Sequence, residues 1–187
     1  TLNRLCGSGI QSIISASQMI MLGEADTVVA GGMENLSQAP HVLRGMRSTY
    51  KLGRPPREGD ELPKDMEDYL FTNLLDTTCN SFMAQTSDEI CRRVGVTREE
   101  ADAFAAISHS RTENSVDNGV WINEIVDVET SSGLITANEE DHFVRGTSDE
   151  SLSSLRTHFG PTSLVTAGNA SGVVDGAAAV VLKSASQ

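Results

Sequence analysis

The first 35 residues change from an apolar helical pattern to a short apolar run bounded by glycines. Residues 7–22 carry isoleucine and methionine on overlapping helical faces, which is typical of a helix buried between layers. Residues 23–26 end this helix, and residues 27–30 predict a short buried strand. Gly31 and Gly32 then permit a close turn or unusual backbone angles. Together with a strand at the very start, this order is a βαβ unit and predicts a parallel sheet with helices on its faces.

The middle of the chain begins with a long stretch that lacks any periodic pattern. From Pro40 to about Asn80, arginines, lysines and prolines cluster, which is typical of a functional or interface loop. Residues 81–93 then predict a helix. A second helix begins after Thr97, because Glu100 completes a capping box, and residues 118–119 (Asn-Gly) end it.

The last third of the chain alternates short apolar runs with polar and glycine-rich segments. The pattern predicts strands at residues 122–128, 164–167 and 177–182, and a short helix at residues 151–156. A glycine-rich loop over residues 168–176 separates the last two strands.

Composition and charge narrow the class of protein. The 187 residues are enough for one core with a smaller lobe, and 39% hydrophobic with 21% charged residues is ordinary for a globular chain. The net charge of −12 argues against a nucleic-acid or anionic-membrane surface, because both need clustered lysine and arginine. The chain also lacks the apolar run of roughly 18 residues that a membrane span needs.

The cysteines and the first residue bear on the compartment. Cys6, Cys79 and Cys91 are odd in number and lack CxxC spacing, so we expect neither a disulfide framework nor a zinc site. A reducing compartment, the cytoplasm, is the preferred location, with the mitochondrial matrix or the peroxisome as alternatives. Because the chain starts at Thr1 in the middle of an apparent strand, we read it as an excerpt or a processed product.

Cys6 is the first candidate for chemistry, since it stands just where a helix begins. A helix N-terminus lowers a thiol pKa through its dipole and its unpaired backbone N–H groups. Gly7 and Gly9 leave space for a substrate, and the backbone N–H of Cys6 could donate to a developing oxyanion. The residues alone leave two interpretations open: a nucleophile, or a small buried thiol at a tight turn.

The glycine-rich loop and the histidines are weaker candidates. Residues 168–172 (GNASG) either only turn the chain, or use Ser171 and backbone groups to hold a polar, extended ligand. We interpret all four histidines as solvated or structurally satisfied, with no metal-ligand spacing; they are His41, His109, His142 and His158. A cysteine nucleophile normally needs a nearby base, and this sequence does not obviously contain one.

Several motifs in register resemble the thiolases, and the resemblance covers essentially the whole chain. They are residues 3–9 (NRLCGSG), 30–34 (AGGME), 37–40 (SQAP), 166–172 (TAGNASG) and 175–178 (DGAA). The degradative 3-ketoacyl-CoA thiolases are the most similar branch, with the acetoacetyl-CoA thiolases close behind. The resemblance implies a layered αβαβα fold of the α/β class, of which this chain would hold a part.

The resemblance also implies a division into domains and an assembly. Residues 1–40 would belong to the N-terminal half-domain and carry the nucleophile. Residues 41–160 would form a loop domain that covers the coenzyme, and residues 161–187 would return to the sheet of the half-domain. A homodimer or homotetramer is expected, with neither nucleic acid nor membrane as a partner.

The implied activity is acyl transfer through Cys6. In this family the matching cysteine attacks the 3-keto carbonyl of an acyl-CoA, keeps an acyl group as a thioester, and passes it to coenzyme A. Coenzyme A and acyl-CoA are therefore expected as substrates, with no other cofactor and no metal. Three alternatives stay open: a biosynthetic acetoacetyl-CoA thiolase, a catalytically incomplete CoA-binding fragment, and a ketoacyl-synthase relative.

Further site residues follow only from the resemblance. The pantetheine and acyl pocket would be lined by Leu74 and Met83, with Phe82 standing where short-chain thiolases usually carry histidine. The adenine and phosphate side would be lined by Arg145, Ser151 and Phe159, and the pantetheine loop would comprise Ala167, Gly168 and Ser171. The family's remaining catalytic parts, an Asn element, a Gly-His-Pro segment and a Cys-Gly-Gly segment, lie beyond the position of Gln187, and neither of the two tripeptides occurs in this sequence.

Overall fold

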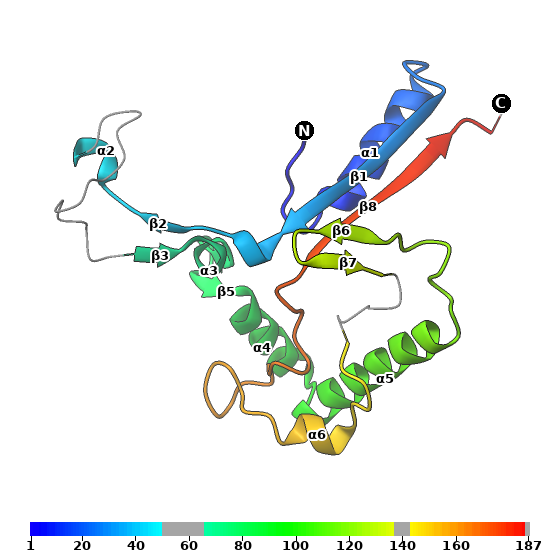
Figure 1. The fold of residues 1–187 in the computed structure, drawn as a ribbon. Helices are drawn as coiled ribbons and strands as arrows, with labels where there is room; N and C mark the ends of the chain where they lie inside the picture. The colour runs from blue at the N-terminus through cyan, green and yellow to red at the C-terminus, as the bar shows by residue number, and fades with distance from the viewer. Residues whose placement is uncertain (50–65, 137–142, 186–187) are drawn as a thin grey trace. The chain divides into compact units, whose positions relative to one another are not determined.

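The computed structural model describes residues 1–49, 66–136 and 143–185 (Figure 1). Its contacts divide the chain into two compact units. Unit 1 comprises residues 1–70 and 173–187, and unit 2 comprises residues 71–172. The domain boundaries expected after residues 40 and 160 separate a half-domain from a loop domain. They differ from the boundaries of these contact units, and the expected domains stay a prediction.

A two-stranded ribbon with one helix against it forms the centre of unit 1. Strand β1 (Thr27–Asn35) pairs antiparallel with β8 (Asp175–Lys183), from Thr27 opposite Lys183 to Asn35 opposite Asp175. Helix α1 (Ser8–Met21) contacts both strands and lies alongside them in Figure 1. It ends where expected, because Gly23 adopts the left-handed conformation at φ 72°.

Three expectations for this region are wrong. Among the described residues β1 pairs antiparallel with β8, and the first residues form no strand. Gly31 and Gly32 continue β1 instead of turning. A Cβ on Gly31 would lie 2.3 Å from the carbonyl oxygen of Ala178, so glycine here allows a close approach of β8.

The predicted burial of this region is also wrong. Ala16 is the one buried residue of α1, and Ala30 is the one buried residue of β1. A single helix covers one face of a two-stranded ribbon, so the other face and most of the helix surface lie open. The apolar pattern is that of a buried helix and strand, but among the described residues no second layer covers it.

The described part of the long middle stretch contains short elements. In unit 1 these are β2 (His41–Leu43), α2 (Met46–Thr49) and β3 (Met66–Asp68), and η1 (Leu36–Gln38) precedes the stretch. Strand β2 pairs antiparallel with β3, and α3 (Tyr69–Asn73) follows at the junction of the two units.

Unit 2 contains three helices and two short antiparallel ribbons in its described residues. The helices are α4 (Met83–Val94), α5 (Arg98–Asp117) and α6 (Asp149–Ser153). The ribbons pair β4 (Leu75–Asp76) with β5 (Ser81–Phe82), and β6 (Val128–Thr130) with β7 (Gly133–Ile135).

The helix signals of unit 2 are confirmed. Thr97 Oγ1 accepts the N–H of Glu100 at 3.2 Å, and the Glu100 carboxylate accepts the N–H of Thr97 at 2.8 Å. Gly119 at φ 66° follows the end of α5. Helix α4 starts two residues later than predicted, because Ser81 and Phe82 form β5.

Two predicted strands are wrong, because local bonds take the place of a strand ladder. Residues 122–124 form turns, with the N–H of Ile122 donating to the carbonyl of Gly119 at 3.3 Å. Residues 164–167 contain only an isolated bridge from Thr166 to Thr157. The side chain of Asn169 bonds the backbone of Leu164 and Thr166 and holds this segment as a turn. No helix within the described ranges is long and apolar enough to cross a bilayer.

Candidate active site

Cys6 lies on an exposed turn that leads directly into α1. It stands two residues before the first helical residue, with Gly7 at the N-cap position. The turn is closed by backbone bonds from Gly7 to Arg4 and from Ser8 to Leu5, each 3.0 Å long. The thiol therefore stands beside the N-terminus of a 14-residue helix, where backbone N–H groups of the first turn have no partner within the helix.

The turn before Cys6 is held in an unusual conformation. Leu5 has a positive φ of 51°, which costs about 1 kcal/mol for a side chain of this kind. The side chain of Asn3 accepts the N–H of Leu5 at 2.8 Å, and the hydroxyl of Ser8 donates to the carbonyl of Leu5 at 2.7 Å. These bonds oppose relaxation of the turn and so fix the backbone on which Cys6 is carried.

The glycines next to Cys6 differ in what surrounds them. A Cβ on Gly7 would lie 3.3 Å from the carbonyl oxygen of Arg4, whereas a Cβ on Gly9 would meet nothing within 4 Å. An open hollow of about 410 Å³ lies at this end of the helix, and its lining residues are Arg4, Gly7, Ile10, Gln11 and Ile14. Space for a ligand therefore exists next to the turn, although Cys6 itself does not line the hollow.

Two of the sequence motifs meet at the end of the ribbon. The N–H of Ser37 donates to Asp175 Oδ1 at 2.9 Å, and the Ser37 hydroxyl donates to the other carboxylate oxygen. The side-chain hydrogen bond from Ser37, followed by the backbone one, holds the pKa of the Asp175 carboxyl below its usual value. Segments 138 positions apart thus close the ribbon in unit 1.

In unit 2 the structure brings the predicted acyl-pocket residues together. The N–H of Met83 donates to the carbonyl of Leu74 at 3.1 Å, next to the short β4–β5 ribbon. The ring of Phe82 stacks on Phe71 with 4.2 Å between centroids, and lies 6.3 Å from the ring of Phe159. Sequence reasoning missed Phe71, because an aromatic residue in an irregular stretch carries no periodic signal.

The predicted pantetheine loop is anchored to α5 through Asn169. Its amide group donates to Asp102 Oδ1 at 2.9 Å and to the carbonyl of Leu164 at 2.8 Å, and its oxygen accepts the N–H of Thr166. Asp102 is only 2% exposed and also accepts a bond from Arg98 at 2.6 Å. Within this loop Ala167 and Ser171 are exposed, as a ligand-contacting position requires.

At Gly168 the same loop packs closely against Leu152 of α6, the helix that also contains Ser151. A Cβ at Gly168 would come within 2.4 Å of Leu152 and 2.6 Å of Leu155, so only glycine fits without displacing these side chains. The hydroxyl of Ser151 donates to the carbonyl of Ser148 at 2.8 Å, within the cap that starts α6. The loop and the predicted adenine-side serine are therefore neighbours.

Arg145 is paired with carboxylates of α5. Its guanidinium lies 2.9 Å from Asp117 and 3.6 Å from Glu113, and 5.2 Å from the ring centroid of Phe143. Its side chain is 53% exposed. An anionic ligand would have to share this arginine with two carboxylates, which weakens the arginine as a phosphate anchor.

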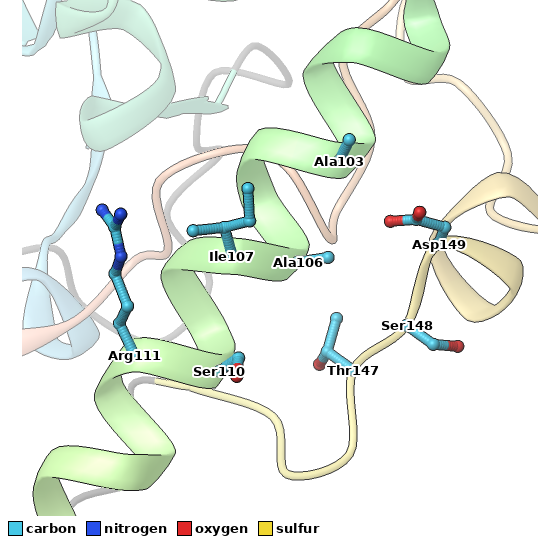
Figure 2. Close-up of a pocket in the computed structure, with 8 residues that line it drawn as sticks. All are labelled: Ala103, Ala106, Ile107, Ser110, Arg111, Thr147, Ser148 and Asp149. Carbon is cyan, nitrogen blue, oxygen red and sulfur yellow. The ribbon is translucent and has the colours of Figure 1, made fainter.

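A second open hollow, of about 480 Å³, runs along α5 (Figure 2). Figure 2 shows side chains of α5 on one wall and Thr147, Ser148 and Asp149 on the other. The helix contributes Ala103, Ala106, Ile107, Ser110 and Arg111. None of the residues predicted for the coenzyme lines this hollow.

The histidines take several environments. His109 bonds backbone groups through both ring nitrogens, and the exposed His158 meets the ring of Phe159 edge-on at 5.0 Å. His41 is exposed on β2, and His142 lies outside the described residues. Among the residues that the structure describes, no cluster of histidine, cysteine and carboxylate side chains could hold a metal ion.

Comparison with known proteins identifies relatives along the whole chain. The family model described as "Thiolase, N-terminal domain" matches residues 1–186. The chain is 38% identical to an acetyl-CoA acetyltransferase of Cupriavidus necator, over all of this chain and 46% of that protein. It is 40% identical to a mitochondrial 3-ketoacyl-CoA thiolase of Bos taurus, over 98% of this chain and 45% of that protein. The chain thus spans a little under half the length of these relatives.

Solved structures give the same result for the fold. The human mitochondrial 3-ketoacyl-CoA thiolase in complex with CoA matches with a TM-score of 0.83 and 35% identity, over 100% of this chain and 45% of that one. An acetyl-CoA acetyltransferase of Bacillus anthracis matches with a TM-score of 0.82 and 30% identity, also over 100% of this chain and 45% of that one. The expected layered α/β fold is therefore confirmed for the part that this chain spans.

Proposed function

Because the chain belongs to the thiolase family, we propose that it supplies the nucleophile and much of the coenzyme site of a 3-ketoacyl-CoA thiolase. The thiolate of Cys6 attacks the 3-keto carbon of the substrate, and the bond between carbons 2 and 3 breaks. Carbon 2 takes up a proton and leaves as acetyl-CoA, while the acyl group stays on Cys6 as a thioester. The thiol of coenzyme A then takes the acyl group and restores Cys6.

The position of Cys6 carries this proposal. Cys6 is exposed, so a substrate can reach its sulfur, and it is carried on a constrained turn at the N-terminus of a long helix. The grouping of nine predicted coenzyme and acyl residues within unit 2 supports it further; they are Leu74, Phe82, Met83, Arg145, Ser151, Phe159, Ala167, Gly168 and Ser171. Coenzyme A as a ligand agrees with the CoA complex of the human structural relative.

A second candidate is acetyl-CoA acetyltransferase activity, run as a condensation. Relatives with that name are as similar to this chain as those named 3-ketoacyl-CoA thiolase. Phe82 favours the degradative reaction, because its ring stacks on Phe71 and gives the pocket an apolar wall for longer acyl chains. We also propose that the whole thiolase is a homodimer or homotetramer in the cytoplasm. Its catalytic histidine and second cysteine would come from sequence beyond the position of Gln187.

The experiment is intact-mass spectrometry of the protein at its native length, with and without acetoacetyl-CoA. We expect a mass gain of one acetyl group that disappears in Cys6→Ala, with Cys79→Ala as the matched control on another exposed cysteine. An acetyl gain that persists in Cys6→Ala would overturn the assignment of the nucleophile. If the native-length protein binds CoA without any gain, the catalytically incomplete CoA-binding alternative would replace the proposed enzyme.

The same assay separates the two candidate reactions. Turnover of longer 3-ketoacyl-CoA substrates at rates comparable with acetoacetyl-CoA would support the degradative enzyme. Turnover confined to acetoacetyl-CoA would support the acetyltransferase.

A further inference from the structure

His109 stands between two segments that are far from it in sequence. Its Nδ1 lies 3.1 Å from the backbone nitrogen of Val144, and its Nε2 lies 3.3 Å from the carbonyl oxygen of Gly168. These partners are 35 and 59 positions away along the chain. One half-buried imidazole on α5 therefore bonds the backbone of both segments.

The partners determine which ring nitrogen carries the proton. The amide of Val144 can only donate, so Nδ1 of His109 accepts. In a neutral imidazole the proton is then on Nε2, which donates to the carbonyl of Gly168. The ring thus uses its one donor and its one acceptor on two different parts of the chain.

Both segments belong to the proposed coenzyme site. Val144 directly precedes Arg145, on the predicted adenine and phosphate side. Gly168 lies in the predicted pantetheine loop, between Ala167 and Asn169. A coenzyme that contacts both segments at once requires a defined spacing between them.

We propose that His109 is a positioning residue that sets the spacing between these two segments and so determines the affinity for coenzyme A. The inference rests on the proposed function. It assigns His109 no part in the acyl chemistry at Cys6, because both ring nitrogens of His109 are engaged by backbone groups of unit 2.

The surrounding contacts explain why the fold should survive without the ring. Asn169 still ties the loop to Asp102, and Arg145 still pairs with Asp117. Val144 is exposed and Gly168 is half-buried, so water can satisfy the two backbone groups when the imidazole is removed. Its loss should therefore loosen the spacing of the segments more than it destabilises unit 2.

Two conservative substitutions separate the two bonds. In His109→Asn the side-chain oxygen takes the place of Nδ1 and can still accept from Val144. In His109→Gln the side-chain nitrogen reaches the place of Nε2 and can still donate to Gly168. His109→Ala removes both bonds, and Ser108→Ala changes an exposed neighbour on the same helix as a matched control.

The measurements are KM for coenzyme A, kcat at saturating coenzyme A and the melting temperature, all on the native-length protein with acetoacetyl-CoA as the second substrate. We expect His109→Ala to raise KM for coenzyme A by roughly tenfold, as two lost hydrogen bonds predict, with kcat within about twofold of wild type. The Asn and Gln variants should each lie between Ala and wild type, and Ser108→Ala should match wild type.

Several results would overturn the inference while leaving the proposed function intact. They are an active wild type with an unchanged KM in His109→Ala, a fall in kcat without a rise in KM, or Asn and Gln variants that fold normally yet restore nothing. If His109→Ala does not fold, the Asn and Gln variants still test the inference. A KM for coenzyme A above that of wild type would support it, and an unchanged KM would overturn it. A wild type that neither forms an acyl-enzyme nor binds coenzyme A would overturn the proposed function, and the inference with it.

Discussion

Asp102 is an acidic residue that is almost fully buried beneath the pantetheine loop. Its carboxylate accepts bonds from Arg98 and Asn169, so one charge ties α5 to a segment 67 positions away. Asp102→Ala would leave the guanidinium of Arg98 and the amide of Asn169 without this acceptor. We expect the free energy of unfolding to fall by about 3 kcal/mol, measured by chemical denaturation.

A matched substitution tests whether burial causes the effect. Glu89 on α4 also accepts bonds from arginines, Arg92 and Arg93, but their side chains are 72% and 73% exposed. Glu89→Ala should lower the free energy of unfolding much less than Asp102→Ala does, because solvent screens exposed pairs. Equal losses for the two variants would show that the Asp102 pair contributes no more than a surface ion pair.

Residues with local partners could be predicted from the sequence, and residues with distant partners could not. Thr97 and Glu100 cap α5 because both stand within one turn, where spacing alone defines the contact. Asp102 and His109 act on loops far along the chain, and nothing in their immediate sequence indicates those partners. The family motifs located Gly168 and Asn169, but the reason for the glycine, its contact with Leu152, required the structure.

At the level of elements, the β1–β8 ribbon depends on one glycine. A Cβ at Gly31 would lie 2.3 Å from the carbonyl oxygen of Ala178 and 2.9 Å from the Cα of Ala179. Both are backbone atoms of the paired strand, so relief would require the strands to separate. We expect Gly31→Ala to lower the free energy of unfolding by about 1–3 kcal/mol, measured by thermal or chemical denaturation.

The neighbouring glycine provides the control within the same strand. A Cβ at Gly32 would meet nothing within 4 Å, so alanine fits there. Gly32→Ala should be neutral, or stabilise by up to about 1 kcal/mol by restricting the unfolded chain. A loss of stability as large as that of Gly31→Ala would mean that strand flexibility, and not close approach, explains both glycines.

Elements with terminal signals were predicted more successfully than elements known only from short apolar runs. Helix α1 is predicted by its apolar periodicity, and α5 by its capping box and by the Asn-Gly sequence that ends it. The runs at residues 122–128 and 164–167 have the composition of strands, but turn bonds and the side chain of Asn169 satisfy their backbone groups. Which partner a short run takes depends on the tertiary structure.

For the whole molecule, the sequence located the parts of the candidate site but not the bonds among them. Motif order placed Cys6 and the coenzyme residues, and the structure groups the latter around α4, α5 and α6 in unit 2. Phe71 and His109 join these residues to one another, yet both stand in segments where the motifs give no signal. Such connecting residues come from packing between distant segments, which a motif does not encode.

The uncovered face of the ribbon leads to a prediction for the 187-residue polypeptide. Val29, Met33 and Val181 lie on the face away from α1, with exposed fractions of 68%, 75% and 70%. A contiguous apolar surface of this kind promotes association, so we expect the polypeptide to bind a hydrophobic dye and to self-associate as its concentration rises. Val29→Thr with Val181→Thr should lower the dye fluorescence and the apparent mass in light scattering.

The opposite face of the same ribbon gives the control. Val28 and Leu182 are paired on the side toward α1 and are partly buried. Changing both to threonine should lower the melting temperature without reducing the dye fluorescence, because these side chains stabilise the unit and expose little surface. Circular dichroism of each variant establishes that the secondary structure persists. Dye fluorescence that is unchanged by the Val29 and Val181 substitutions would show that association arises elsewhere on the chain.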